Sequence, residues 1–227
     1  MSIMAPLKIE QSGLTYTVDF KNSKSLSVSQ TLPVTASLYD LVARRLNDVS
    51  AMLYNSDKTF NFDGSSARIA ATGNLFNRSS NQELTIMCFA KPCRLGGQYQ
   101  IIAENRAYDG SNLNWILYQH VSDGSVQLHG TAQNKSSYIP ITNVWSHFSV
   151  TVNSGLTSSL YVNGTLQQTV NAYAYAGTGP GYFTIGGDGN GGECFSGSID
   201  LVSIYNRALS GSEINQYYQG KKSRFGL

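Results

Sequence analysis

The C-terminal stretch FSGSIDLVSIYNRALSGSEINQYYQ (Phe195–Gln219) decides the fold, because it reads as one long strand followed by a short helix. Apolar residues alternate with polar ones in its first half. The residues of this strand expected in the core are Ile199, Leu201 or Val202, and Ile204. In the second half Ser210 precedes Glu213 by three residues, which is the capping-box pattern of a helix N-terminus. The helix would lay Ile214, Tyr217 and Tyr218 on the sheet and cover apolar surface that strands alone leave exposed.

Working outward, the rest of the chain repeats the strand pattern. The 227 residues include 14 Tyr, 9 Phe and 22 Gly but only 13% charged residues, a composition typical of strands joined by many turns. SSLYVNGTLQQTV (Ser158–Val170) predicts a hairpin, since Asn163-Gly164 suits a two-residue type I′ turn. About ten short strands without helices between them predict antiparallel sheets packed face to face.

The stretch SLYDLVARRLNDVSAMLY (Ser37–Tyr54) is ambiguous. Its leucines and valines fit a helical stripe, and a short helix and an irregular crossover are equally compatible with it. No repeat or linker divides the chain, so we expect one domain over residues 1–227, with an N-terminal arm at 1–13 and a basic tail at 219–227. The tail carries few apolar groups and is expected to stay mobile in the free monomer.

Charge and cysteine content narrow the function classes. A net charge of +2 is too small for a general nucleic-acid binder, and no apolar run of about 18 residues predicts a membrane span. The start MSIMAPLKIEQ lacks the features of a secretion signal. The three cysteines lack metal-ligand spacing and are interpreted as small hydrophobes or free thiols, consistent with a reducing cytoplasm. They are Cys88, Cys93 and Cys194.

Four segments in order resemble the laminin G-like, concanavalin A-like lectin-glucanase jelly-roll domains of phage and bacterial surface proteins. The segments are FNFDGSSARI (Phe60–Ile69), ELTIMCFAKP (Glu83–Pro92), WSHFSVTVNSGLTSSLYVNGTL (Trp145–Leu166) and FTIGGDGNGGECFSGSIDLVSIYNRALSGSEINQYYQ (Phe183–Gln219). The opening GLTYTVDFKNSKSLS (Gly13–Ser27) and the ending GKKSRFGL (Gly220–Leu227) are similar to those of phage-type members. The resemblance implies an all-β, two-sheet antiparallel jelly-roll sandwich with a short C-terminal helix.

This superfamily includes glycoside hydrolases, so the resemblance leaves an enzyme possible. Retaining hydrolysis needs two carboxylates about 5 to 5.5 Å apart. Glu104 and Asp200 have no second carboxylate at a suitable spacing and are expected to be surface or hairpin residues. The scattered His120, His129 and His147 are expected to be exposed or hydrogen-bonded structural groups. We therefore expect no catalytic residues and no enzyme, with a hydrolase kept only by analogy of fold.

Two kinds of binding site are compatible with the loops. Relatives bind calcium through loop oxygens, and the candidates here are Asp188, Asn190 and Glu193. Three donors are few for an ion that takes six to eight, so a plain turn, no metal and no cofactor are expected, with calcium as the alternative. The Gly-rich stretch NAYAYAGTGPGYF holds Tyr173, Tyr175 and Tyr182, which suit a subunit contact or, less favoured, a glycan site. The tail residues expected to contact a neighbouring subunit are Lys221, Lys222, Arg224 and Phe225.

The resemblance leads to a functional hypothesis. The chain is expected to be a non-enzymatic phage virion structural protein, a capsid decoration or cement protein at the virion surface, made in the host cytoplasm. Its partners would be other virion proteins or neighbouring copies in a homo-oligomer, with no nucleic acid and no membrane. The alternative is a carbohydrate-binding adhesin module of a tail fibre or another appendage that binds a host-surface glycan.

Overall fold

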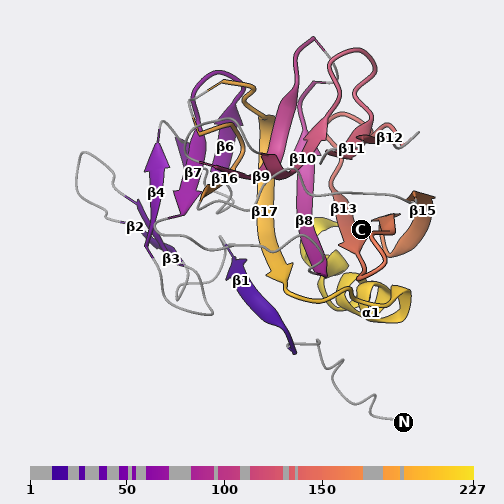
Figure 1. The fold of residues 1–227 in the computed structure, drawn as a ribbon. Coiled ribbons are helices and arrows are strands. Elements are labelled where there is room, and N and C mark those ends of the chain that lie inside the picture. The colour runs from indigo at the N-terminus through magenta and orange to yellow at the C-terminus, as the bar shows by residue number, and fades with distance from the viewer. Residues whose placement is uncertain are drawn as a thin grey trace.

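In a computed structural model the chain forms two antiparallel β-sheets packed face to face (Figure 1). The structure describes residues 12–19, 26–28, 36–39, 46–50, 53–54, 60–71, 83–94, 97–107, 113–129, 133–135, 138–170, 181–189 and 192–227. The two-sheet jelly-roll sandwich expected from the sequence is confirmed.

The strand order places the C-terminal strand in the middle of one sheet. The eight-stranded sheet has the order β15 (Thr165–Val170), β14 (Ser158–Val162), β13 (Ser146–Val152), β8 (Leu84–Pro92), β17 (Ser196–Tyr205), β6 (Phe60–Asp63), β5 (Leu53–Tyr54), and β1 (Leu14–Val18) also pairs with β17. The nine-stranded sheet has the order β12 (Gln133–Lys135), β11 (Val126–His129), β10 (Leu113–Gln119), β9 (Gln100–Ala107), β16 (Gly181–Ile185), β7 (Arg68–Ala71), β4 (Leu46–Ser50), β3 (Ala36–Tyr39), β2 (Leu26–Val28).

Strand β17 is buried on both faces. It pairs with β8 along one side and with β6 and β1 on the other (Figure 1). Ile199, Val202 and Ile204 point into the core between the sheets, as expected. Leu201 lies on the opposite face, because a register shift follows Asp200 and Leu201 takes a positive φ of 52°. This bulge decides between Leu201 and Val202, which the alternation alone left open.

The C-terminal helix covers the outer face of the eight-stranded sheet. Helix α1 (Gly211–Lys221) is followed by the 3₁₀ turn η1 (Lys222–Phe225). Ile214 and Tyr217 of α1 are buried in a second apolar cluster, and Tyr218 packs against it. The cluster contains side chains of β8 and β17 that would otherwise face water. The expected helix and its apolar face are confirmed. No helix in the described ranges is long and apolar enough to span a membrane.

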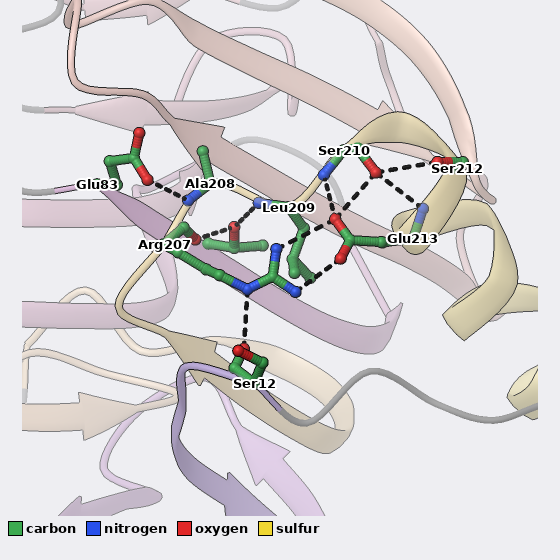
Figure 2. A network of polar contacts seen from close by, with 9 residues as sticks. Ser12, Glu83, Arg207, Ala208, Leu209, Ser210, Ser212 and Glu213 are labelled. Carbon is green, nitrogen blue, oxygen red and sulfur yellow. Dashed lines mark hydrogen bonds and ion pairs between the residues drawn. The ribbon is translucent and has the colours of Figure 1, made fainter.

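The helix start is fixed by the network in Figure 2. The Ser210 side chain accepts a hydrogen bond from the backbone N–H of Glu213, and the Glu213 carboxylate accepts one from the backbone N–H of Ser210 at 2.7 Å. Arg207 donates to both Glu213 oxygens, at 3.1 and 2.7 Å. This bond to Arg207 is the main reason why the pKa of Glu213 is lowered to about 2. The predicted capping box is therefore present and reinforced by an arginine outside the helix.

The expectation of a mobile C-terminal tail is wrong for the residues after Tyr218. Phe225 is buried and stacks on Phe89, with 3.9 Å between ring centroids. A terminal nitrogen of Arg224 contacts one oxygen of Asp19 at 2.6 Å and one of Asp200 at 2.7 Å. The tail packs on its own domain because the outer face of the sheet offers it an apolar surface and two carboxylates. Residues 1–11 of the predicted N-terminal arm lie outside the described residues.

The segment Ser37–Tyr54 contains strands, whereas the sequence predicted a short helix or an irregular crossover, so neither interpretation holds for the described residues. β3 pairs with β2 and β4, β4 also pairs with β7, and β5 pairs with β6. Backbone pairing with strands distant in the sequence therefore outweighs the local helical pattern. The intervening residues lie outside the described ranges.

Candidate functional site

The face of the nine-stranded sheet that points away from the main core carries an unusual set of side chains. Trp115 and Leu117 of β10 belong to the core, so Ile116 and Tyr118 lie on the opposite face. Ile101 packs with these two residues in a separate cluster. Cross-strand neighbours of these residues lie on the same face. On β11, Gln127 pairs with Tyr118 and His129 pairs with Ile116. On the other side, Glu104 of β9 pairs with Ile116, and Thr184 of β16 pairs with Glu104.

Tyr99 stands at the edge of this face on a firmly held backbone. It directly precedes β9, and the residue is 37% exposed. Its neighbour Gln98 donates hydrogen bonds to two backbone carbonyls of adjacent loops, at 3.2 and 3.1 Å. Gln100, on the other side, is buried and also binds backbone groups through its amide. The N–H of Gly97 donates to the carbonyl of Val121 at 2.8 Å, which ties this loop to the β10–β11 turn.

Two histidine rings lie beside Tyr99 and its neighbour Tyr118. The Tyr99 ring meets Tyr118 edge-on at 5.6 Å and His120 edge-on at 5.4 Å. His129 meets Tyr118 at 6.4 Å. We call Tyr99, Tyr118, His120 and His129 the Tyr99 cluster. Because both neighbours approach the exposed ring perpendicularly, its position is defined while part of it remains open to solvent.

A directed chain of hydrogen bonds leads from Tyr118 to the surface. The Tyr118 hydroxyl donates to Gln127 at 3.0 Å, and the Gln127 amide donates to the Ser125 hydroxyl at 2.8 Å. That hydroxyl donates to the Asp123 carboxylate at 2.7 Å. Every donor of the chain points toward Asp123, whose side chain is 53% exposed. The chain therefore ends in a charged hydrogen-bond acceptor at the rim of the Tyr99 cluster.

The electrostatic environment of the cluster is acidic. Burial is the main cause that raises the pKa of Tyr118 to about 12, and the nearby negative charges of Glu193 and Asp123 raise it further. Hydrogen bonds from the Ser125 backbone and side chain lower the pKa of Asp123, which keeps it ionised. The carbonyl of Glu193 accepts a hydrogen bond from the Ile101 N–H at 2.9 Å. Glu193 therefore lies beside β9, at the residue that pairs with Tyr118 of β10.

The two carboxylates considered for catalysis are buried, so the expectation that they are surface or hairpin residues is wrong. Glu104 accepts a hydrogen bond from the Gly189 N–H at 3.1 Å and holds the Gly-rich loop. Asp200 binds Arg224 on the outer face of the other sheet. Each charge is stabilised by a group distant in sequence, which composition cannot reveal. The two carboxylates lie on opposite faces of the sandwich.

The loop considered as an alternative calcium site is stabilised by hydrogen bonds between Asp188 and Gly192. Asp188 accepts a hydrogen bond from the Gly192 N–H at 2.6 Å, and the Gly192 carbonyl accepts one from the Asp188 N–H at 3.1 Å. Asn190 lies outside the described residues. Within the described ranges, no three His, Cys, Asp or Glu side chains gather closely enough to hold a metal ion. The donors that the structure does describe therefore do not form a calcium-ligand set.

The other predicted site residues are not brought together. Tyr173 and Tyr175 lie outside the described residues, and Tyr182 lies in β16 opposite a residue of β9. Lys221 and Lys222 are half-buried at the end of α1, with the Lys222 ammonium 5.6 Å from the Tyr218 ring centroid. Arg224 and Phe225 are engaged within the domain, as described above. All three cysteines are free thiols, with only Cys93 exposed.

Sequence reasoning missed the Tyr99 cluster. The alternation rule places Tyr118 and the following His120 on one side of β10, and this was the available signal. No pattern connects Tyr99 with them, because their contact depends on the pairing of β9 with β10.

Comparison with known proteins supports the fold. The family model described as the concanavalin A-like lectin/glucanases superfamily, of the laminin G type, matches residues 63–215. No curated protein matches the chain in sequence. Similar solved structures include the Trypanosoma rangeli sialidase, with a TM-score of 0.69 and 15% identity, where the match covers 95% of this chain and 34% of that chain.

Two further structures are similar. Domain 4 of AbnA, a GH43 extracellular arabinanase from Geobacillus stearothermophilus solved with arabinotriose, has a TM-score of 0.63 and 16% identity over 92% of this chain and 100% of that chain. The binding domain of botulinum neurotoxin serotype D has a TM-score of 0.66 and 18% identity over 92% of this chain and 52% of that chain. Nothing in these matches indicates a phage-type protein. Since the family model covers more than half of its residues, the chain belongs to the laminin G-type family of the concanavalin A-like lectin/glucanases superfamily.

Proposed function

We propose that the chain is a carbohydrate-binding domain and that it binds glycans at the Tyr99 cluster. The observation that carries this proposal is the partly exposed Tyr99 ring on a backbone held by Gln98 and Gln100. A rigid aromatic ring can stack on the C–H face of a sugar with little loss of conformational entropy. The exposed acceptor Asp123 lies close by and suits sugar hydroxyl groups.

The similar structures support a binding role more than a structural one. The arabinanase domain was solved with arabinotriose, and this chain matches that domain over its full length. The whole sialidase is much longer than the present chain, so its activity is not carried over. The virion location inferred from sequence resemblance has no support from the geometry, and we do not extend the proposal to it.

We further infer that the domain binds without hydrolysing. A glycosidase places two carboxylates on either side of one bond, whereas Glu104 and Asp200 belong to different sheets. Incubation with polysaccharides should release no reducing ends. Turnover that disappears on Glu104→Gln would contradict this inference.

A glycan array tests the binding function. The folded full-length chain is applied to neutral and acidic oligosaccharides, and we expect retention on at least one class that rises with protein concentration. A sample unfolded in urea serves as the control for non-specific adsorption. Retention on none of the glycans, or equal retention of the unfolded sample, would refute the proposal.

A further inference from the structure

The surroundings of Tyr99 carry information about the class of sugar, provided that the proposed carbohydrate binding is correct. Two carboxylates flank the cluster from different elements. Asp123 belongs to the β10–β11 turn, and its Oδ1 lies 3.7 Å from Nδ1 of His120, whose ring contacts Tyr99. Glu193 lies on the opposite side, where its backbone pairs with Ile101.

The hydrogen bonds of the rim all run in one direction. Tyr118, Gln127 and Ser125 each donate toward Asp123, so both hydroxyl hydrogens and one of the two Gln127 amide hydrogens are already used within the protein. The charged end of the chain offers acceptors to a ligand. A sugar hydroxyl can donate to such an acceptor, whereas a carboxylate on a sugar has no proton to donate and repels the negative charge.

Two described arginines, Arg94 and Arg68, lie toward the Asp63 turn. Arg94, on the loop that precedes Tyr99, lies with its guanidinium group against Gly64, next to Asp63. Arg68 lies near Cys194, together with Asp63 and Asp188. These two arginines therefore lie with the acidic residues Asp63 and Asp188.

We propose that the Tyr99 cluster selects uncharged sugars and rejects carboxylated ones, because Asp123 and Glu193 flank the aromatic platform. The selectivity is electrostatic, so it depends on these two charges and on ionic strength. A purely steric preference would depend on neither.

Matched pairs of oligosaccharides test the proposal. The probes are galactotriose against trigalacturonic acid, and lactose against sialyllactose, titrated by calorimetry at pH about 7.5. We expect the wild-type chain to bind at least one neutral member more tightly than its carboxylated partner, by about fivefold or more. The ratio should shrink in about 0.5 M NaCl, where charges are strongly screened.

Three variants locate the effect. Tyr99→Ala should weaken binding of the neutral probe by about fivefold or more, and Tyr99→Phe should retain it. The double variant Asp123→Asn, Glu193→Gln should narrow the ratio between neutral and carboxylated probes. Leu166→Ala, an exposed apolar change on the other sheet, is the matched control and should alter neither binding nor the ratio.

The outcomes separate this inference from the proposed function. Binding that prefers the carboxylated probe overturns the inference and leaves the proposed function intact. Binding that is unchanged in Tyr99→Ala overturns the inference and the proposed location of the site, and leaves only carbohydrate binding itself intact. A ratio that is unchanged in both salt and the double variant overturns the electrostatic cause. Binding of no probe, together with a negative glycan array, refutes both proposals.

Discussion

Lowering the pH should destabilise the domain through His147, which lies under the C-terminal helix. Its side chain is fully buried, with ring centroids of Phe89, Tyr217 and Tyr218 at 4.7, 5.6 and 5.8 Å. Nε2 lies 3.3 Å from the Ser149 hydroxyl, and Nδ1 has no hydrogen-bond partner among the described residues. Burial lowers the pKa of His147 from 6.5 to about 3.

The sign and size of the effect follow from this pKa. The imidazole stays neutral in the folded protein but takes up a proton in the unfolded chain below pH 6.5. Its contribution is therefore fully present above pH 6.5 and is lost as the pH falls toward 3. The slope is about 1.4 kcal/mol per pH unit, so lowering the pH from about 7.5 to about 5 should reduce the free energy of unfolding by about 2 kcal/mol.

Urea unfolding followed by tryptophan fluorescence measures this change, because Trp145 contacts Phe225 in the same cluster. Wild type, His147→Gln and His147→Leu are compared at both pH values, with His120→Gln as the matched control. We expect both His147 variants to lose about 2 kcal/mol of pH dependence whatever their absolute stability, and His120→Gln to keep it. Equal pH dependence in wild type and both His147 variants would show that this histidine does not remain neutral in the fold.

Three further changes test the packing of the C-terminal helix and of the sheet that it covers. Arg224→Met removes the cation between Asp19 and the buried Asp200 and should lower the free energy of unfolding in urea by about 3 to 5 kcal/mol. A loss below about 1 kcal/mol would show that the ion pairs contribute little. Gly197→Ala introduces a Cβ at a φ of 141° against the carbonyl oxygen of Lys91 and should lower the free energy of unfolding by more than about 1 kcal/mol. Gly97→Ala is the control, because Gly97 also has a positive φ but a Cβ there meets no atom within 4 Å, so it reports backbone strain alone. Glu213→Gln weakens the link between the helix start and Arg207 and should cost about 1 kcal/mol at neutral pH, with the difference from wild type disappearing as the pH falls from 4.5 toward 2.

Local patterns accounted for several elements of the fold. The capping box needs only Ser210 and Glu213, three residues apart, and the hairpin turn needs only Asn163-Gly164, which take φ values of 50° and 77°. Alternation within β17 indicates Ile199 as a core residue, but the bulge after Asp200 is needed to bring Ile204, five residues later, to the same face. Each of these signals acts over a few residues, where backbone geometry is the dominant constraint.

The burial and the partners of the charged side chains could not be predicted from local patterns. Asp200 and Arg224 are 24 residues apart, and only the docking of η1 on the outer face brings them together. Glu104 is buried because a loop that follows another strand donates to it. The energy of a buried charge depends on such partners, and composition contains no record of them.

The sequence by itself determined the all-β class, the final strand and the capped helix, since alternation and capping are properties of neighbouring residues. The tertiary structure alone decided that Phe225 packs on its own domain, that the segment Ser37–Tyr54 forms strands, and that Tyr99 meets Tyr118 and His120. These outcomes depend on which strands pair and in which register. Pairing brings together residues that are far apart along the chain, so the candidate binding surface exists only once both sheets have formed.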